Sequence, residues 1–183
     1  MKNSAVLLGA LLLAAPGLHA AEAPLAVDLS KACKLVVTPM DLSVDPPTGS
    51  CWSFACESGK AQNLGCGLTE LMQVAELRPS SDRNWLAVIS VGEGHPILEI
   101  VDLAKLWKAH EYQAVKTVNP YPGTINLVGW TDRYVIVSSD MTLDELPIKD
   151  GEPIDHMLPT QRLFRIETGG WRITPMKAAD RQP

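Results

Sequence analysis

WLAVISVGEGHPILEIVDL, residues 85–103, is the stretch of this 183-residue chain that most clearly indicates its fold. Its two ends are rich in β-branched and apolar residues, which favour strands, and its middle holds two glycines and a proline, which favour turns. We therefore predict a β-hairpin with strands at 85–90 and 97–103. The five residues at the predicted tip are Gly92, Glu93, Gly94, His95 and Pro96.

The same pattern recurs about 49 residues further along the chain. WTDR at 130–133 leads into YVIVSS at 134–139, and LFRIETGG at 163–170 corresponds to the second strand. In the first copy a polar turn precedes the hairpin; in this turn Asp82 can bond its own backbone and Asn84 can tolerate a left-handed conformation. A repeat of this length is typical of architectures in which each repeat forms one small sheet.

Both copies resemble blades of the WD40 or TolB-like β-propeller repeat, over residues 74–171. A closed propeller needs about four to eight blades of 40–50 residues, so a chain of this length cannot close a ring. We therefore predict an all-β fold: two small antiparallel propeller-blade-like sheets at 71–183, packed face to face, and an irregular, disulfide-stapled N-terminal segment at 21–70. We expect these two parts to form one compact domain.

Residues 1–20 have the composition of a cleavable signal peptide. Lys2 is followed by an apolar run at 5–15 and by Leu-His-Ala at 18–20, which places a small residue at the cleavage position. The run is shorter than the roughly 20 apolar residues that a membrane-spanning helix needs. We therefore predict a secreted, periplasmic protein that is not anchored in the membrane.

Export would place the four cysteines, Cys33, Cys51, Cys56 and Cys66, in an oxidising compartment where thiols pair. Two disulfides with three possible connectivities are expected. Of these we favour Cys51 with Cys56 as a short loop and Cys33 with Cys66 as a long one. The spacing contains no C-x-x-C pair, which argues against a zinc site and against a thioredoxin-type motif.

The segment GSCWSF at 49–54 resembles the segment around the nucleophile of papain-like cysteine proteases. In that family a histidine activates the thiolate, and here the later phrase that could supply it is Asp155-His156. The segment lacks the Gln that precedes the nucleophile in that family, and the chemistry needs a free Cys51 thiol. A papain-like hydrolase is therefore a third functional alternative, and we predict that the protein is not an enzyme.

An acidic segment interrupts the second repeat. Residues 140–160 separate its two strands, whereas an ordinary hairpin loop has about two to five residues. Six acidic residues and one Lys lie in this segment, and clustered like charge attracts an oppositely charged partner. A solvated loop, a surface for a basic partner and a calcium site are the alternatives. The acidic residues that we assign to partner binding are Asp144, Glu145, Asp150, Glu152 and Asp155.

The composition excludes several other functional classes. With 16 Lys+Arg against 21 Asp+Glu, the formal net charge is −5, so a basic face for nucleic acid is not expected. The sequence contains no nucleophile elbow, no phosphate-binding glycine loop and no paired His-Glu zinc motif. His110 and His156 have no partner at ligand spacing. We therefore predict no catalytic residues, no metal and no cofactor.

The signal peptide, the size, the early disulfides and the incomplete propeller-like sheet together resemble the periplasmic immunity proteins that neutralise type VI secreted peptidoglycan amidases. In that family a loop between blade strands plugs the catalytic cleft of the toxin, and the matching position here is 92–96, which contains no serine. The resemblance implies a secreted protein-binding module, an inhibitor that blocks a basic toxin or hydrolase by loop insertion or occlusion. The alternative is an accessory or ligand-binding subunit of a cell-envelope complex, whose open sheet edges another chain completes.

Overall fold

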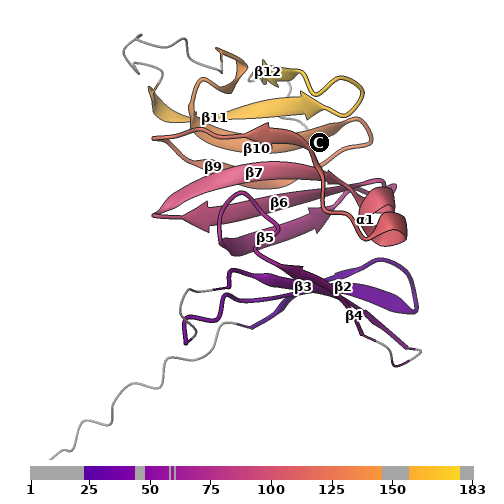
Figure 1. Cartoon of the computed structure of the whole chain (residues 1–183). Coiled ribbons are helices and arrows are strands. Elements are labelled where there is room, and N and C mark those ends of the chain that lie inside the picture. Colours follow the sequence, from indigo (N-terminus) through magenta and orange to yellow (C-terminus); the bar gives the residue numbers. More distant parts are fainter. Residues whose placement is uncertain (1–22, 44–47, 58, 60, 146–156, 178–183) are drawn as a thin grey trace, which may run out of the picture.

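The computed structural model describes residues 23–43, 48–57, 59, 61–145 and 157–177, and contains three four-stranded antiparallel sheets that follow one another along the chain (Figure 1). Sheet A consists of β1 (Leu25–Asp28), β2 (Cys33–Thr38), β3 (Cys51–Cys56) and β4 (Gln62–Cys66). Sheet B consists of β5 (Gln73–Pro79), β6 (Trp85–Gly92), β7 (His95–Asp102) and β8 (Ala114–Val118). Sheet C consists of β9 (Ile125–Trp130), β10 (Tyr134–Met141), β11 (Met157–Glu167) and β12 (Ile173–Pro175).

The predicted hairpin is confirmed as β6 and β7, which pair from Trp85↔Asp102 to Gly92↔His95. The strands continue further toward the tip than expected, so two residues connect them instead of six. These two, Glu93 and Gly94, have φ values of 51° and 83°. Two successive residues with positive φ are what a tight hairpin turn requires, because its twist matches that of the flanking strands.

The second copy of the repeat is also a hairpin, since β10 pairs with β11 from Tyr134↔Glu167 onward. The turn before β6 is partly as predicted: the Asn84 backbone N–H donates to Asp82 Oδ1 at 3.1 Å. The left-handed residue is Arg83 (φ 59°), however, and not Asn84. The Arg83 N–H donates to the Ser80 carbonyl while Asp82 bonds Asn84, so the bend falls on the residue between them.

The prediction of two sheets behind an irregular N-terminal segment is wrong, because that segment forms a third sheet. In β2 and β3 alternate residues are buried on one face: Leu35, Val37, Trp52 and Phe54. This alternation is the signature of a strand with one buried face. The cysteines and turn residues around these two short runs obscured the alternation.

Two apolar layers hold the three sheets together, in the order A, B, C seen from bottom to top in Figure 1. Sheet B is buried on both faces: Leu86 and Val88 belong to the layer shared with sheet A, whereas Ala87 and Ile89 belong to the layer shared with sheet C. A strand that is buried on both faces has no solvent-facing polar side, which explains the apolar run from Trp85 to Ile89 in β6.

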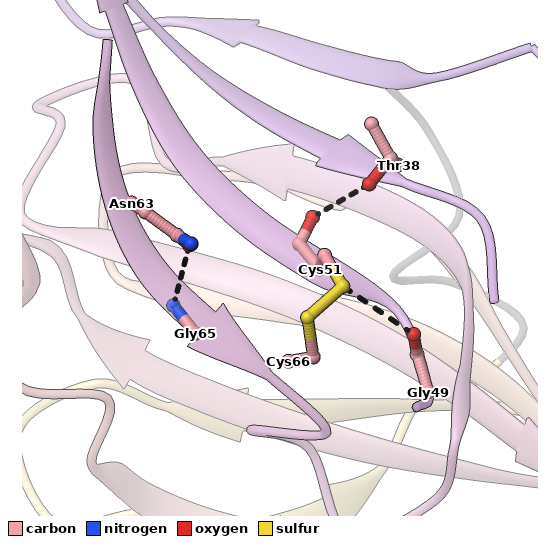
Figure 2. The surroundings of a disulfide bond; sticks show 6 residues. All are labelled: Thr38, Gly49, Cys51, Asn63, Gly65 and Cys66. Carbon is pink, nitrogen blue, oxygen red and sulfur yellow. Dashed lines mark hydrogen bonds between the residues drawn. A yellow bond between two sulfur atoms is a disulfide. The ribbon is translucent and has the colours of Figure 1, made fainter. Parts of the chain in front are cut away.

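The two disulfides join neighbouring strands of sheet A, Cys33 with Cys56 and Cys51 with Cys66. Figure 2 shows the second of these bridges. The favoured pairing of Cys51 with Cys56 is therefore wrong. Both residues belong to β3, and five steps along a strand separate their Cα atoms by roughly 17 Å, far more than a disulfide can span. In the observed pairing each bridge links residues that lie directly opposite each other in the ladder.

A short helix, α1 (Leu103–Ala109), was not predicted. The strand expected to run to Leu103 ends at Asp102, whose side chain accepts a hydrogen bond from the Lys105 N–H at 2.9 Å and so caps the helix. Leu103 and Leu106 are buried in the layer between sheets A and B. The helix thereby covers one end of that layer.

The paired cysteines indicate an oxidising, extracytoplasmic compartment, since all four are in disulfides. Within the described ranges, none of the helices has the length and apolar character needed to cross a membrane. The predicted signal peptide at 1–20 lies outside the described residues.

Candidate protein-binding surface

Strand register brings five connections to one end of the molecule, at the left of Figure 1. We call this the loop end and define it by the described parts of these connections, which are residues 39–43, 48–50, 67–72, 93–94, 119–124 and 142–145. Hydrogen bonds fix these connections in place. The Ser50 N–H donates to the Met72 carbonyl at 2.7 Å and joins two connections, and the Thr124 N–H donates to Oδ1 of Asp140, near the end of β10, at 2.6 Å. The other ends of the strands form the opposite end, which carries α1.

The predicted tip residues lie in the middle of the loop end. Glu93 and Gly94 are exposed, while Gly92 and His95 form the last pair of the β6–β7 ladder. A Cβ at Gly92 would lie 3.2 Å from a methyl carbon of Leu71, so the hairpin packs closely on the β4–β5 connection. On its other side, the His95 ring contacts the Tyr121 ring with centroids 4.6 Å apart. The tip is therefore held between two neighbouring connections.

A surface pocket of about 520 Å³ opens beside the tip. Residues from the β2–β3 connection, the β4–β5 connection, the hairpin and the β8–β9 connection line it together. Its apolar lining consists of Met40, Leu71, Met72, Val91, Ile97 and Tyr121, and its polar lining includes Glu70, Glu93 and His95. Three of the predicted site residues, Gly92, Glu93 and His95, thus belong to one concave site with residues that the sequence analysis missed.

The missed residues include large apolar side chains that point into solvent. Leu42 is 72% exposed, Tyr121 56% and Met72 45%. Each stands in a turn-rich segment without the periodic apolar neighbours that mark a strand. An apolar residue isolated among Pro, Gly and polar residues, as in NPYPG at 119–123, is the signal that could have pointed to this surface.

Two buried polar side chains position the β4–β5 connection that forms one wall of the pocket. Ser50 is 1% exposed, and its Oγ accepts from the Val74 N–H at 2.9 Å. Glu99 is 3% exposed, and its Oε2 accepts from the Glu70 N–H at 3.0 Å. Because buried polar groups are costly to leave unpaired, these bonds hold the connection in place.

Glu99 is the one buried carboxylate among the described residues. Burial raises its pKa, and this is opposed by hydrogen bonds from the Glu70 N–H and the Ser90 hydroxyl. Nearby, the Tyr112 hydroxyl is buried and makes no hydrogen bond of good geometry within the described chain. Burial, together with the charge of Glu99, raises the pKa of Tyr112 well above its ordinary value. The neutral forms of both groups are therefore favoured in this layer.

The predicted acidic segment begins and ends at the loop end. Asp140 is part of β10, Asp144 is exposed on the short 3-10 helix Leu143–Glu145, and Glu145 is the last residue of that helix. Asp150, Glu152 and Asp155 lie outside the described residues. Met141 pairs with Met157, so the ladder of β10 and β11 closes the base of the segment.

Charge is distributed unevenly between the two ends. The described connections of the loop end contain no Lys or Arg and five acidic residues, Asp41, Glu70, Glu93, Asp144 and Glu145. The described connections of the opposite end contain six basic residues (Lys31, Arg83, Lys105, Lys108, Arg133 and Arg172) and four acidic ones (Glu57, Asp82, Glu111 and Asp132). The sequence analysis found clustered acidic residues only in the segment 140–160, whereas in the structure the acidic residues of the loop end extend over several connections.

The papain-like alternative loses its nucleophile, because Cys51 is bonded to Cys66 and has no free thiol. Among the described residues, no group of three or more His, Cys, Asp or Glu side chains is arranged to hold a metal ion. The arrangement at the loop end offers instead an apolar recess, exposed apolar side chains and carboxylates.

No protein-family model, curated protein or solved structure matches this chain.

Proposed function

We propose that this chain is a periplasmic protein-binding module, an inhibitor of the immunity type, which blocks another protein with its loop end. In this proposal the three sheets are blades of an incomplete propeller, and the partner is a basic toxin or hydrolase that acts in the periplasm. The observation that carries the proposal is the convergence of exposed apolar side chains, a pocket and carboxylates from separate connections at one end. Exposed apolar groups gathered in this way mark binding surfaces.

The hairpin tip is the element that we propose enters a cleft of the partner. It projects from sheet B, which is buried on both faces, and its two-residue turn has little freedom to lose. A rigid element costs less conformational entropy on binding than a flexible loop. The carboxylates around the tip would attract a basic partner over a distance and would orient it.

Site-specific photo-crosslinking tests this function. A benzoyl-phenylalanine residue replaces Tyr121 at the loop end, which is 56% exposed. In the matched control it replaces Trp107 on α1, an aromatic residue that is 38% exposed. After irradiation in producing cells, we expect the Tyr121 variant to capture one defined protein and the Trp107 variant to capture none. The purified protein should then inhibit the activity of the captured partner.

Charge reversal provides a second measurement with its own control. Glu93→Lys and Asp132→Lys change the net charge equally, each at an exposed turn, but at opposite ends of the molecule. We expect Glu93→Lys to weaken the complex about tenfold and Asp132→Lys to leave it nearly unchanged. Equal effects of the two variants, or capture from Trp107 alone, would contradict the proposal.

The alternative function is that of an accessory subunit in a cell-envelope complex. It is favoured by the outermost strands β4, β8 and β12, each of which has a neighbour on one side only in its sheet. Such an edge can accept a strand from another chain. Captured partners that form a stable assembly and keep their activity would support this alternative over an inhibitor.

A further inference from the structure

We propose that the pocket at the loop end binds a single apolar side chain of the partner, one that stands among Lys or Arg residues on the partner's surface. This inference rests on the proposed function and specifies the chemistry that the partner must present. The occupant of the pocket is therefore a protein segment of the pattern basic–apolar–basic.

The lining of the pocket supports an apolar occupant. Met40, Leu71, Met72, Val91 and Ile97 contribute aliphatic or thioether surface to a recess of about 520 Å³. Methionine side chains are flexible and polarisable, so they adapt to apolar partners of different shape. Pockets of this kind, filled by one side chain near the centre of a contact, provide most of the affinity of many protein interfaces.

The rim of the pocket supports basic neighbours. Glu70 and Glu93 line it on two separate connections, and both are exposed. Asp41 adds a further charge next to Met40, and hydrogen bonds from the Ser43 side chain and backbone hold its pKa below the ordinary value. The described connections around the pocket contain no Lys or Arg, so no lysine or arginine of these connections would oppose a basic residue of the partner that meets these carboxylates.

The walls of the pocket are built before any partner arrives. The buried Glu99 side chain accepts from the Glu70 N–H within the β4–β5 connection, the buried Ser50 side chain accepts from the Val74 N–H just after it, and the hairpin packs against Leu71. Tyr121 on the β8–β9 connection contacts the His95 ring edge-on, with an angle of 70° between the ring planes, and lines the pocket on that side. A preformed recess binds a side chain without the cost of ordering its own walls.

Short peptides test the inference by NMR on protein with labelled Met and Leu methyl groups. The probes are Ac-Lys-Gly-Leu-Gly-Lys-NH₂ and two relatives, in which Ser replaces the Leu or Glu replaces both Lys residues. We expect saturable shifts of the Met72 and Leu71 methyl signals with the first peptide. The Ser and the Glu peptides should each bind about tenfold more weakly.

Two matched variants locate the site. Met72→Ser should abolish the shifts, whereas Val128→Ser should leave them intact, because Val128 is equally exposed (48% against 45%) but lies on β9 and not in the pocket. A thermal unfolding curve of each variant confirms that it is folded.

Three results would overturn the inference: no saturable shift at millimolar peptide, equal affinity for the Ser peptide, or an unchanged response of Met72→Ser. These results are distinct from a failure of the proposed function. Crosslinking from Tyr121 and weakening by Glu93→Lys can succeed while the peptides fail, and the loop end would then bind its partner without using the pocket.

Discussion

The two layers between the three sheets differ in chemistry. In the layer between sheets B and C the buried side chains of the cluster are aliphatic, Met and Phe, with Leu98, Ile100, Val135 and Val137 completely buried. Trp85, Trp130 and Trp171 are partly buried and pack against them. The layer between sheets A and B contains the buried carboxylate of Glu99 and two buried groups that make no hydrogen bond of good geometry within the described chain, the Tyr112 hydroxyl and the Trp52 indole N–H. Both disulfides lie in sheet A, which borders the layer that contains these polar groups.

The difference shows how the fold compensates for a less favourable layer. Buried polar groups without full hydrogen bonding cost free energy, and covalent cross-links stabilise the sheet that faces them. Glu99 also accepts a hydrogen bond from the Glu70 N–H, on the connection that forms one wall of the pocket at the loop end. Sheet C is held by apolar burial, whereas sheet A depends on its bridges as well.

The largest expected effect comes from removing volume in the layer between sheets B and C. Ile100→Ala should lower the free energy of unfolding by about 4 kcal/mol, because it leaves a cavity among side chains that cannot collapse to fill it. Urea unfolding followed by tryptophan fluorescence measures this loss. Val128→Ala, at a half-exposed position of β9, is the control and should cost less than about 0.5 kcal/mol.

Loss of the bridge between β3 and β4 should have the next largest effect. Replacing Cys51 and Cys66 together by Ser opens a loop with a sequence separation of 15 and should cost about 3 kcal/mol. Hydrogen exchange should increase in sheet A and should stay slow in sheet C. Uniformly faster exchange over all three sheets would show that the layers do not differ in the way described.

The fold was predictable from the sequence where one local rule decided the structure. The apolar runs of sheet B and the repeat that leads to sheet C were identified because the apolar and β-branched residues predicted strands and the Gly, Pro and polar residues between them predicted turns at the same places. Sheet A was missed because only two buried positions in each of β2 and β3 show the alternation, and a mixture of Cys, Lys, Val, Thr, Ser and Ala occupies the rest. The disulfide pairing was missed for a related reason, since it follows from the register of strands that had not been recognised.

The candidate site was predictable only in part. The tip residues were found from their glycines, but the pocket beside them depends on Met72 and Tyr121, which come close only through the order of strands in sheet B and its neighbours. Glu99 stood in an apolar strand pattern and gave no hint that its carboxylate would hold a distant connection. Contacts of this kind depend on tertiary structure, which local periodicity does not encode.

The buried carboxylate makes the stability of the layer between sheets A and B depend on pH. Burial raises the pKa of Glu99 above its ordinary value of 4.5, so the folded state binds the proton more tightly than the unfolded state. The contribution of Glu99 to stability is therefore present below pH 4.5 and is lost as the pH rises through its raised pKa. Glu99→Gln should remove this loss, since its amide oxygen still accepts from the Glu70 N–H.

Unfolding curves at pH 4 and pH 7 measure this effect. When the pH is raised from 4 to 7, the free energy of unfolding of the Glu99→Gln variant should increase relative to that of the unsubstituted protein. Glu111→Gln, at an exposed position, should show no such gain. A difference between variant and unsubstituted protein that stays constant with pH would mean that Glu99 is not protonated more readily in the fold.

The smallest effect is expected at Met72 of the loop end, which belongs to neither apolar layer. Met72 is 45% exposed at the mouth of the pocket, so Met72→Ser should change the free energy of unfolding by less than about 0.5 kcal/mol. Thermal unfolding compared with that of Val128→Ser measures it. A loss above about 1 kcal/mol would mean that Met72 belongs to the core between sheets A and B. In that case its apolar surface serves the fold, and the pocket would have less of it to offer a partner.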